Sequence, residues 1–340
     1  MVFRVQSSTM QKLLFIMVLA VISGCGTNST AEKLVVYTSR QPQLIEPLFE
    51  QYTKETGIEI VHLSGDAQQL LERIKTEGED TAADLFITVD AGVLWQAAER
   101  GMLESVTSKT LQANIPAYLR DPDNQWFGLS KRLRTIVINN AAMQEAPKSY
   151  AELATNDWNS RLCLRTSQKV YNQSLIASFI ANFGEQDTLK VLNGWINNLA
   201  TKVFSSDTLA LKAVQAGQCD ATIVNSYYLG RLVATGEAEN LNLIWANQDS
   251  TGVHVNISGG GVVKYSKQKT EAIKLLEWLT SSWAQEQYAN LNLEYPVVEG
   301  TALHPVLESW GEFKEDNLNA KILGALQKEA VLLAREANYN

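Results

Sequence analysis

The sequence predicts an α/β protein of two lobes joined by two crossing strands. Apolar, β-branched segments alternate with amphipathic helical segments along most of the chain, which is typical of parallel βαβ units. The pattern starts again after a long apolar strand predicted at residues 131–139, and a second candidate crossing strand lies at residues 253–257. With 340 residues, the chain is long enough for two domains of about 100–200 residues each.

The first lobe is predicted from three successive strand–helix pairs. Strands are expected at residues 34–37, 58–63 and 84–89, and helices at residues 43–55, 67–77 and 93–100. Asp90 follows the third strand, where it can point into a cleft or cap the helix that begins near Val93. We assign residues 33–132 and 256–302 to this N-terminal lobe.

The second lobe, residues 133–255 and 303–340, is predicted to be more helical. Its strands are expected at residues 161–165 and 221–225, and its helices at residues 172–183, 187–199 and 317–337, with a further helix ending at residue 216. One more helix, at residues 271–282, falls in the first lobe. The run Gly259-Gly260-Gly261 lacks the ending of a phosphate-binding loop and is interpreted as a tight bend.

The start of the chain is interpreted as an export signal at residues 1–24. Its apolar run, residues 13–22, is too short to span a bilayer comfortably as a helix. The run ends in Ile22-Ser23-Gly24-Cys25, which resembles a bacterial lipobox, a pattern in which the cysteine is lipidated and becomes the mature N-terminus. The alternative is a conventional signal peptide with Cys25 incidental. Residues 25–32 are predicted to form a tether.

The two remaining cysteines, Cys163 and Cys219, leave two alternatives open. An exported compartment permits a disulfide, and a remaining pair fits one; two buried free thiols are the alternative.

Composition and charge exclude several classes of function. The net charge of −8 argues against a nucleic-acid partner. Only 3 His and 3 Cys are present, against 11 Tyr, which excludes a His-rich or Cys-rich metal site. No Ser-His-Asp, His-Glu-x-x-His or nucleophile-elbow motif is found, so no enzymatic activity is predicted.

Three tyrosines stand at matching positions after predicted strands of the second lobe. Tyr227 and Tyr228 follow the strand at residues 221–225, and Tyr171 follows the strand at residues 161–165. A phenolate is a hard oxygen donor, and three phenolates would neutralise a ferric ion. The alternative is that these side chains fill core edges or an aromatic cleft for an organic ligand.

Seven segments, in order along the chain, resemble the ferric-ion-binding substrate proteins of bacterial iron ABC transporters, which have the class II periplasmic-binding-protein fold. They are residues 36–40 (VYTSR), 87–92 (ITVDAG), 126–132 (WFGLSKR), 170–175 (VYNQSL), 225–231 (NSYYLGR), 254–259 (HVNISG) and 294–297 (EYPV). The resemblance implies that Tyr171, Tyr227 and Tyr228 are the iron ligands of the second lobe. It also implies an inner-membrane permease with its ATPase as partner.

The first lobe departs from this family. The family commonly has His followed by Tyr where this sequence has Gln41-Pro42. Water, a chelator or a small anion such as carbonate would then fill the open coordination positions. Arg40, Arg132 and Arg134 can hold such an anion by charge-assisted hydrogen bonds, with pairing at the hinge or surface as the alternative.

We therefore predict a monomeric periplasmic or cell-surface lipoprotein that binds ferric iron, with no nucleic-acid partner. Hinge closure is expected to shield the ion between the lobes. The alternative function is binding of a ferric chelate or of a small organic or phosphonate anion. A colour band from phenolate-to-iron charge transfer would separate the two.

Overall fold

The computed structural model describes residues 33–143 and 145–340, and these residues belong to one compact unit. The predicted signal peptide (residues 1–24) and the whole of the predicted tether (residues 25–32), including Cys25, lie outside the described residues. In the described ranges, no helix is long and apolar enough to cross a membrane.

The described strands join in the order β2-β1-β3-β8-β4-β6-β5, and β7 and β9 also pair with β4. Their bounds are β1 (Lys33–Thr38), β2 (Glu59–Ser64), β3 (Leu85–Thr88), β4 (Phe127–Asn139), β5 (Leu162–Cys163), β6 (Ala221–Asn225), β7 (Leu241–Ile244), β8 (His254–Val262) and β9 (Tyr295–Pro296). The strands β1, β2 and β3 are parallel to one another, as are β5 and β6. This arrangement matches the βαβ units that the sequence predicts.

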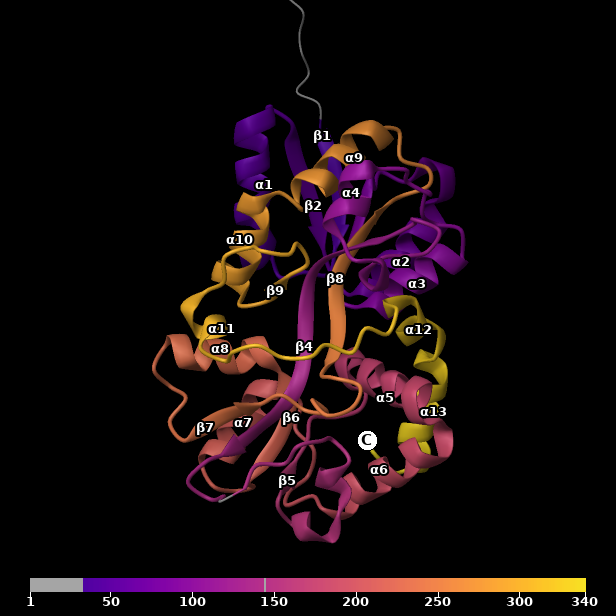
Figure 1. Ribbon diagram of the computed structural model, residues 1–340. Coiled ribbons are helices and arrows are strands. Elements are labelled where there is room, and N and C mark those ends of the chain that lie inside the picture. The colour runs from indigo at the N-terminus through magenta and orange to yellow at the C-terminus, as the bar shows by residue number, and fades with distance from the viewer. Residues whose placement is uncertain (1–32, 144) are drawn as a thin grey trace, which may run out of the picture. The chain divides into compact units, whose positions relative to one another are not determined.

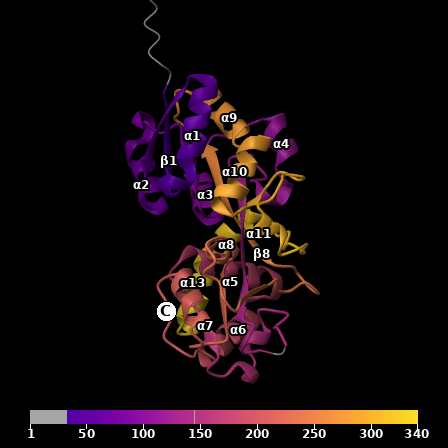
Figure 2. The ribbon, with the colours of Figure 1, turned by 90° about the vertical axis from the view of Figure 1, so that its left-hand side faces the viewer.

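Two long antiparallel strands, β4 and β8, run side by side from one lobe into the other (Figure 1). On β4, Leu129 belongs to the first hydrophobic core and Ile136 to the second. Figure 2 shows the two lobes, each with its own helices, from the side, with β8 between them. The predicted two-lobed fold with two crossing strands is thereby confirmed.

Helices cover the strands of both lobes. The first lobe contains α1 (Pro42–Thr56), α2 (Ala67–Glu77), α3 (Ala91–Glu99), α4 (Lys109–Asn114), α9 (Lys269–Trp278) and α10 (Ser282–Asn292). The second contains α5 (Val170–Phe183), α6 (Glu185–Asn197), α7 (Asp207–Gln215) and α8 (Ser226–Ala234). Short 3-10 turns occur at Gly78–Asp80, Ala117–Leu119, Glu152–Ala154 and Asn156–Trp158. The helix α10, which begins after the capping side chain of Ser281, was not predicted.

The C-terminal segment differs from the single helix predicted at residues 317–337. It forms α11 (Pro305–Glu308), α12 (Ala320–Ala325) and α13 (Gln327–Glu336), with α12 and α13 separated at Leu326. Leu307 and Leu323 pack into the first core, whereas Leu333 packs into the second. The chain after residue 303 therefore contacts both lobes, where the sequence assigns it to the C-terminal lobe alone. The other lobe boundaries stay a prediction.

The interpretation of Gly259-Gly260-Gly261 as a tight bend was wrong, because all three residues lie inside β8. A Cβ atom at Gly259 would lie 2.7 Å from the carbonyl oxygen of Phe127, and one at Gly261 would lie 2.5 Å from that of Gln125. The glycines are needed for close approach of neighbouring backbone rather than for a turn.

A Gly261→Ala substitution should therefore destabilise the protein by about 1–3 kcal/mol, because the added methyl group overlaps a backbone carbonyl that cannot move freely. Urea unfolding measures this change. Gly65→Ala is the matched control, since its nearest neighbour would be a Leu70 side-chain atom at 3.6 Å. Equal stability of the two variants would contradict the close-approach explanation.

Cys163 and Cys219 form a disulfide that links β5 to the segment before β6, with a Cα–Cα distance of 5.8 Å. Of the two alternatives that the sequence leaves open, the structure has the disulfide. The bond therefore ties β5, which precedes Tyr171, to the segment that leads into β6, which precedes Tyr227.

Candidate functional site

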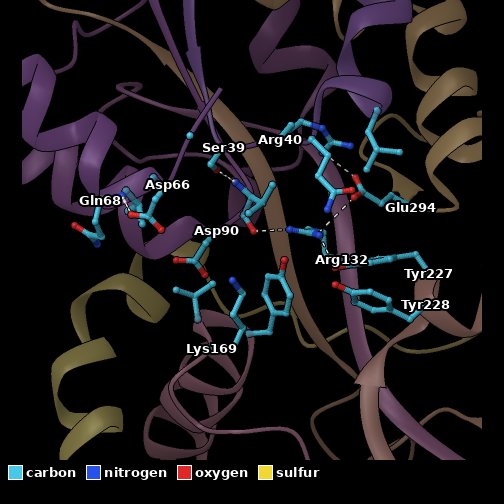
Figure 3. A pocket seen from close by; sticks show the side chains of 18 of the residues that line it. Ser39, Arg40, Asp66, Gln68, Asp90, Arg132, Lys169, Tyr227, Tyr228 and Glu294 are labelled. Carbon is cyan, nitrogen blue, oxygen red and sulfur yellow. Dashed lines mark hydrogen bonds and ion pairs between the residues drawn. The ribbon is translucent and has the colours of Figure 1, made fainter. Parts of the chain in front are cut away.

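A cavity of about 280 Å³ lies where the loops that follow β1 and β3 face the starts of α5 and α8. Its walls combine first-lobe residues such as Ser39 and Asp90 with second-lobe residues such as Lys169 and Tyr228 (Figure 3). Loops at the carboxyl ends of strands are where ligands of open α/β sheets bind. The cavity therefore occupies the position expected for a ligand.

The three tyrosines predicted as ligands all line this cavity. The strand β6 ends at Asn225, which is the N-cap of α8, so Tyr227 and Tyr228 fall in the first turn of that helix. Tyr171 occupies the equivalent place in α5, after its N-cap Lys169. Successive strand–helix junctions thus bring the three phenols to one edge of the sheet, and the rings of Tyr227 and Tyr228 are 4.5 Å apart.

The guanidinium of Arg132 lies at the centre of the tyrosine cluster. It is 4.9 Å from the ring centroid of Tyr171 and 4.8 Å from that of Tyr227, and it donates a hydrogen bond to the Tyr227 hydroxyl. It also donates to the carbonyl oxygen of Val89 at 2.7 Å, so it contacts the loop after β3 as well. Arg132 thus links the tyrosines of the second lobe to the first lobe.

Burial and charge act on the three phenols in different ways. For Tyr171, burial raises the pKa, but the charges of Arg132 and Lys169 together hold this pKa below the ordinary value of 10. Burial raises the pKa of Tyr227 well above 10 and also raises the pKa of Tyr228, although Arg132 opposes both shifts. Tyr171 is therefore the phenol that loses its proton most readily, and a cation must supply the stabilisation for the other two.

The buried carboxylate of Glu294 also pairs with Arg132. Glu294 is an ion-pair partner of Arg40 at 3.0 Å and of Arg132 at 3.5 Å, and it accepts a hydrogen bond from Ser130 at 2.5 Å. Burial raises the pKa of Glu294, but Arg40 and Arg132 together hold it below the usual range, so the carboxylate stays charged. Figure 3 shows Arg132 reaching between Glu294 and the pair Tyr227 and Tyr228.

Arg40 is the best-placed anion donor among the predicted arginines. Its side chain is 1% exposed, yet its Nε and Nη2 atoms have no hydrogen-bond partner among the described residues. It also lines the cavity. Buried donors without partners are costly, so a small anion that reaches these two atoms would be bound favourably.

Arg134 does not line the cavity. It is fully buried and pairs with Asp207 at 3.1 Å, and it also donates hydrogen bonds to Asn172 and Asn225. All of its guanidinium nitrogens are engaged, so it is not available to an anion, contrary to the prediction. Sequence reasoning missed Asp207, because its only local signal is a place at the start of a helix.

The first lobe offers few metal donors. Gln41 lines the cavity, and its amide oxygen accepts a hydrogen bond from Gln43 at 2.9 Å. Asp90 caps α3 through Gly92 and accepts from Asn256, and it also lines the cavity, so the structure shows both of its predicted roles. Asp66, also on the wall, caps α2.

No described group of three or more His, Cys, Asp or Glu residues could hold a metal ion. His254 is buried against Ser174, and burial, with the charge of Arg134, lowers its pKa to about 3. The three phenols are oxygen donors that the cavity brings together in one place.

The chain is similar to known proteins over most of its length. The family model of bacterial extracellular solute-binding proteins matches residues 80–315. Iron uptake protein A1 of Synechocystis sp. is 38% identical over 334 residues, covering 94% of this chain and 93% of the relative. Among solved structures, a Trichodesmium protein in complex with iron and citrate ligands matches with a TM-score of 0.87 and 41% identity, covering 91% of this chain and all of that chain.

A ferric binding protein from Campylobacter jejuni matches with a TM-score of 0.84 and 32% identity, over 90% of this chain and 100% of the other. These matches confirm the resemblance that the sequence motifs indicate.

Proposed function

The chain belongs to the bacterial extracellular solute-binding proteins, and we propose that its cargo is ferric iron held by the phenolates of Tyr171, Tyr227 and Tyr228. Members of this family bind solutes and are not enzymes. The observation that carries the proposal is the gathering of these three phenols on one cavity around the guanidinium of Arg132. The iron uptake and ferric binding relatives support it.

Charge balance favours an anion bound together with the iron. Three phenolates cancel the charge of Fe³⁺. The cavity is lined by four cationic side chains and three carboxyl groups: Arg40, Arg132, Lys169, Arg231, Asp66, Asp90 and Glu294. Burial raises the pKa of Asp90, which favours its neutral form and adds to the positive excess. A carbonate or a citrate carboxylate would relieve this excess and complete the coordination.

Within this proposal, Arg40 and Arg132 hold the anion, and Gln41 lies at the mouth of the cavity without coordinating the metal. The first-lobe ligands of the family are then replaced by the anion's oxygens. The solved relative with iron and citrate shows that a protein of this fold can carry both.

Delivery is proposed to follow the pattern of bacterial ABC transporters. Closure of the two lobes about β4 and β8 would shield the ion, and a membrane permease with its ATPase would receive it. Lipidation at Cys25 would keep the monomer near that permease.

Titration of the mature apoprotein with ferric citrate tests the proposal. Binding by phenolates should produce a visible charge-transfer band that saturates at one iron per chain. Sodium citrate without iron is the control and should produce no band. A protein that stays colourless and retains no iron would refute the ferric site.

A small organic or phosphonate anion is the second candidate cargo, and the unpaired nitrogens of Arg40 favour it. Calorimetric titration of the iron-free protein with 2-aminoethylphosphonate and with citrate separates the two candidates. Tight binding of either anion to a protein that binds no iron would support the second candidate.

A further inference from the structure

Asp207 is a buried carboxylate that connects to two of the tyrosines through arginine side chains. It is the first residue of α7, and its side chain is fully buried. One carboxylate oxygen lies 3.1 Å from Nη1 of Arg134, and the other accepts a hydrogen bond from Nη1 of Arg165 at 2.7 Å. A carboxylate enclosed in this way fixes two guanidinium groups relative to each other.

The ion pair of Asp207 with Arg134 connects to both segments that carry the tyrosines. Nε of Arg134 donates to Oδ1 of Asn172 at 2.9 Å, and Nη1 donates to Oδ1 of Asn225 at 3.3 Å. Asn172 directly follows Tyr171 in the chain. Asn225 donates through Nδ2 to the hydroxyl of Tyr227 at 2.9 Å. One arginine therefore connects the segments that carry the two phenols.

The ion pair of Asp207 with Arg165 connects to Tyr171. The guanidinium of Arg165 lies 5.3 Å from the ring centroid of Tyr171. The carbonyl oxygen of Arg165 accepts a hydrogen bond from Nδ2 of Asn172 at 2.9 Å, which closes the loop that leads into α5. The position of this loop is thus tied to the position of Asp207.

We propose that Asp207 is a positioning residue, which holds Tyr171 and Tyr227 at the spacing that one metal ion requires by fixing Arg134 and Arg165. This inference rests on the proposed ferric site. In this inference Arg134 supports the segments that carry the ligands, and does not make the anion contact predicted from the sequence. Loss of an outer group that orients a metal ligand commonly lowers the metal affinity by about 10- to 100-fold.

Charge and position predict different effects when Asp207 is neutralised. Its negative charge acts unfavourably on the ionised forms of Tyr227 and Tyr228, but it also attracts the ferric ion. Binding exchanges three phenol protons for one Fe³⁺ and leaves the charge of the site unchanged, so by charge alone an Asp207→Asn substitution would leave the affinity nearly unchanged. Loss of positioning would weaken binding, so a large loss of affinity identifies the role.

The experiment compares Asp207→Asn with Asp220→Asn in the mature chain, using ferric citrate as the probe. Asp220 pairs with Arg161 at 2.6 Å, at the opposite ends of β5 and β6 from the tyrosines, and so controls for loss of an aspartate–arginine ion pair in the same lobe. We expect Asp207→Asn to bind iron about 10- to 100-fold more weakly and to shift the charge-transfer maximum. Asp220→Asn should match the wild type in both.

Arg134→Lys, which keeps the charge and loses the branched hydrogen bonds, provides a second test if Asp207→Asn does not fold. It should weaken iron binding in the same direction. A folded Asp207→Asn protein that binds iron with unchanged or higher affinity would overturn the positioning role, as would an Arg134→Lys protein with wild-type affinity and spectrum. A wild-type protein with no band would instead refute the ferric site, and the inference with it.

Discussion

A Tyr227→Phe substitution should lower the affinity for ferric iron by more than about 100-fold, above the loss caused by removing an outer partner of a ligand. The change removes a phenolate and leaves the ring in place. Tyr227 is 1% exposed, and its hydroxyl accepts hydrogen bonds from Arg132 and Asn225. Leaving these donors unpaired should also cost about 1–3 kcal/mol of stability.

Competition with citrate for iron measures the affinity, and the charge-transfer band reports the remaining phenolates. Tyr37→Phe is the matched control, because Tyr37 is also buried and its hydroxyl bonds to Glu77 at 3.1 Å, away from the cavity. That variant should keep the full band and the wild-type affinity. A Tyr227→Phe protein with an undiminished band would remove Tyr227 from the ligand set.

The tyrosine cluster could be predicted from the sequence because its position follows from local order. A strand that leads into a helix places the start of that helix at the carboxyl edge of the sheet. The strand β6 leads directly into α8, which carries Tyr227 and Tyr228, and a short loop joins β5 to α5, which carries Tyr171. Nothing beyond the alternation of strands and helices was needed. The structure confirms that the three side chains share one cavity, whereas their role as ligands stays a prediction.

The different roles of Arg132 and Arg134 could not be predicted. The two residues are separated by one position on β4, so both point to the same face of the strand. What distinguishes them are partners far away in the sequence: Glu294 pairs with Arg132, and Asp207 pairs with Arg134. Such partners are fixed by tertiary packing, which a single sequence does not reveal. The same applies to Gly261, whose neighbour is the backbone of Gln125.

A Glu294→Gln substitution should destabilise the iron-free protein by about 3–5 kcal/mol, because it leaves Arg40 and Arg132 as buried cations without a counter-charge. The amide keeps the size of the side chain, so the loss is one of charge and not of packing. Asp187→Asn is the control, since its partner Lys190 is exposed and such pairs contribute at most about 1 kcal/mol. Urea unfolding measures both changes.

Two further measurements test this prediction: the pH dependence of the stability and the effect of an added anion on it. The pKa of Glu294 is depressed in the folded state, so its contribution is complete above the ordinary value of 4.5 and is lost as the pH falls below it. The difference between wild type and Glu294→Gln should shrink over that range.

Bicarbonate should stabilise Glu294→Gln more than the wild type, because an anion bound only by the folded state can take the place of the lost carboxylate beside Arg40. A variant as stable as the wild type at neutral pH and indifferent to bicarbonate would show that the two arginines do not need Glu294. The anion site proposed on them would then lose its main support.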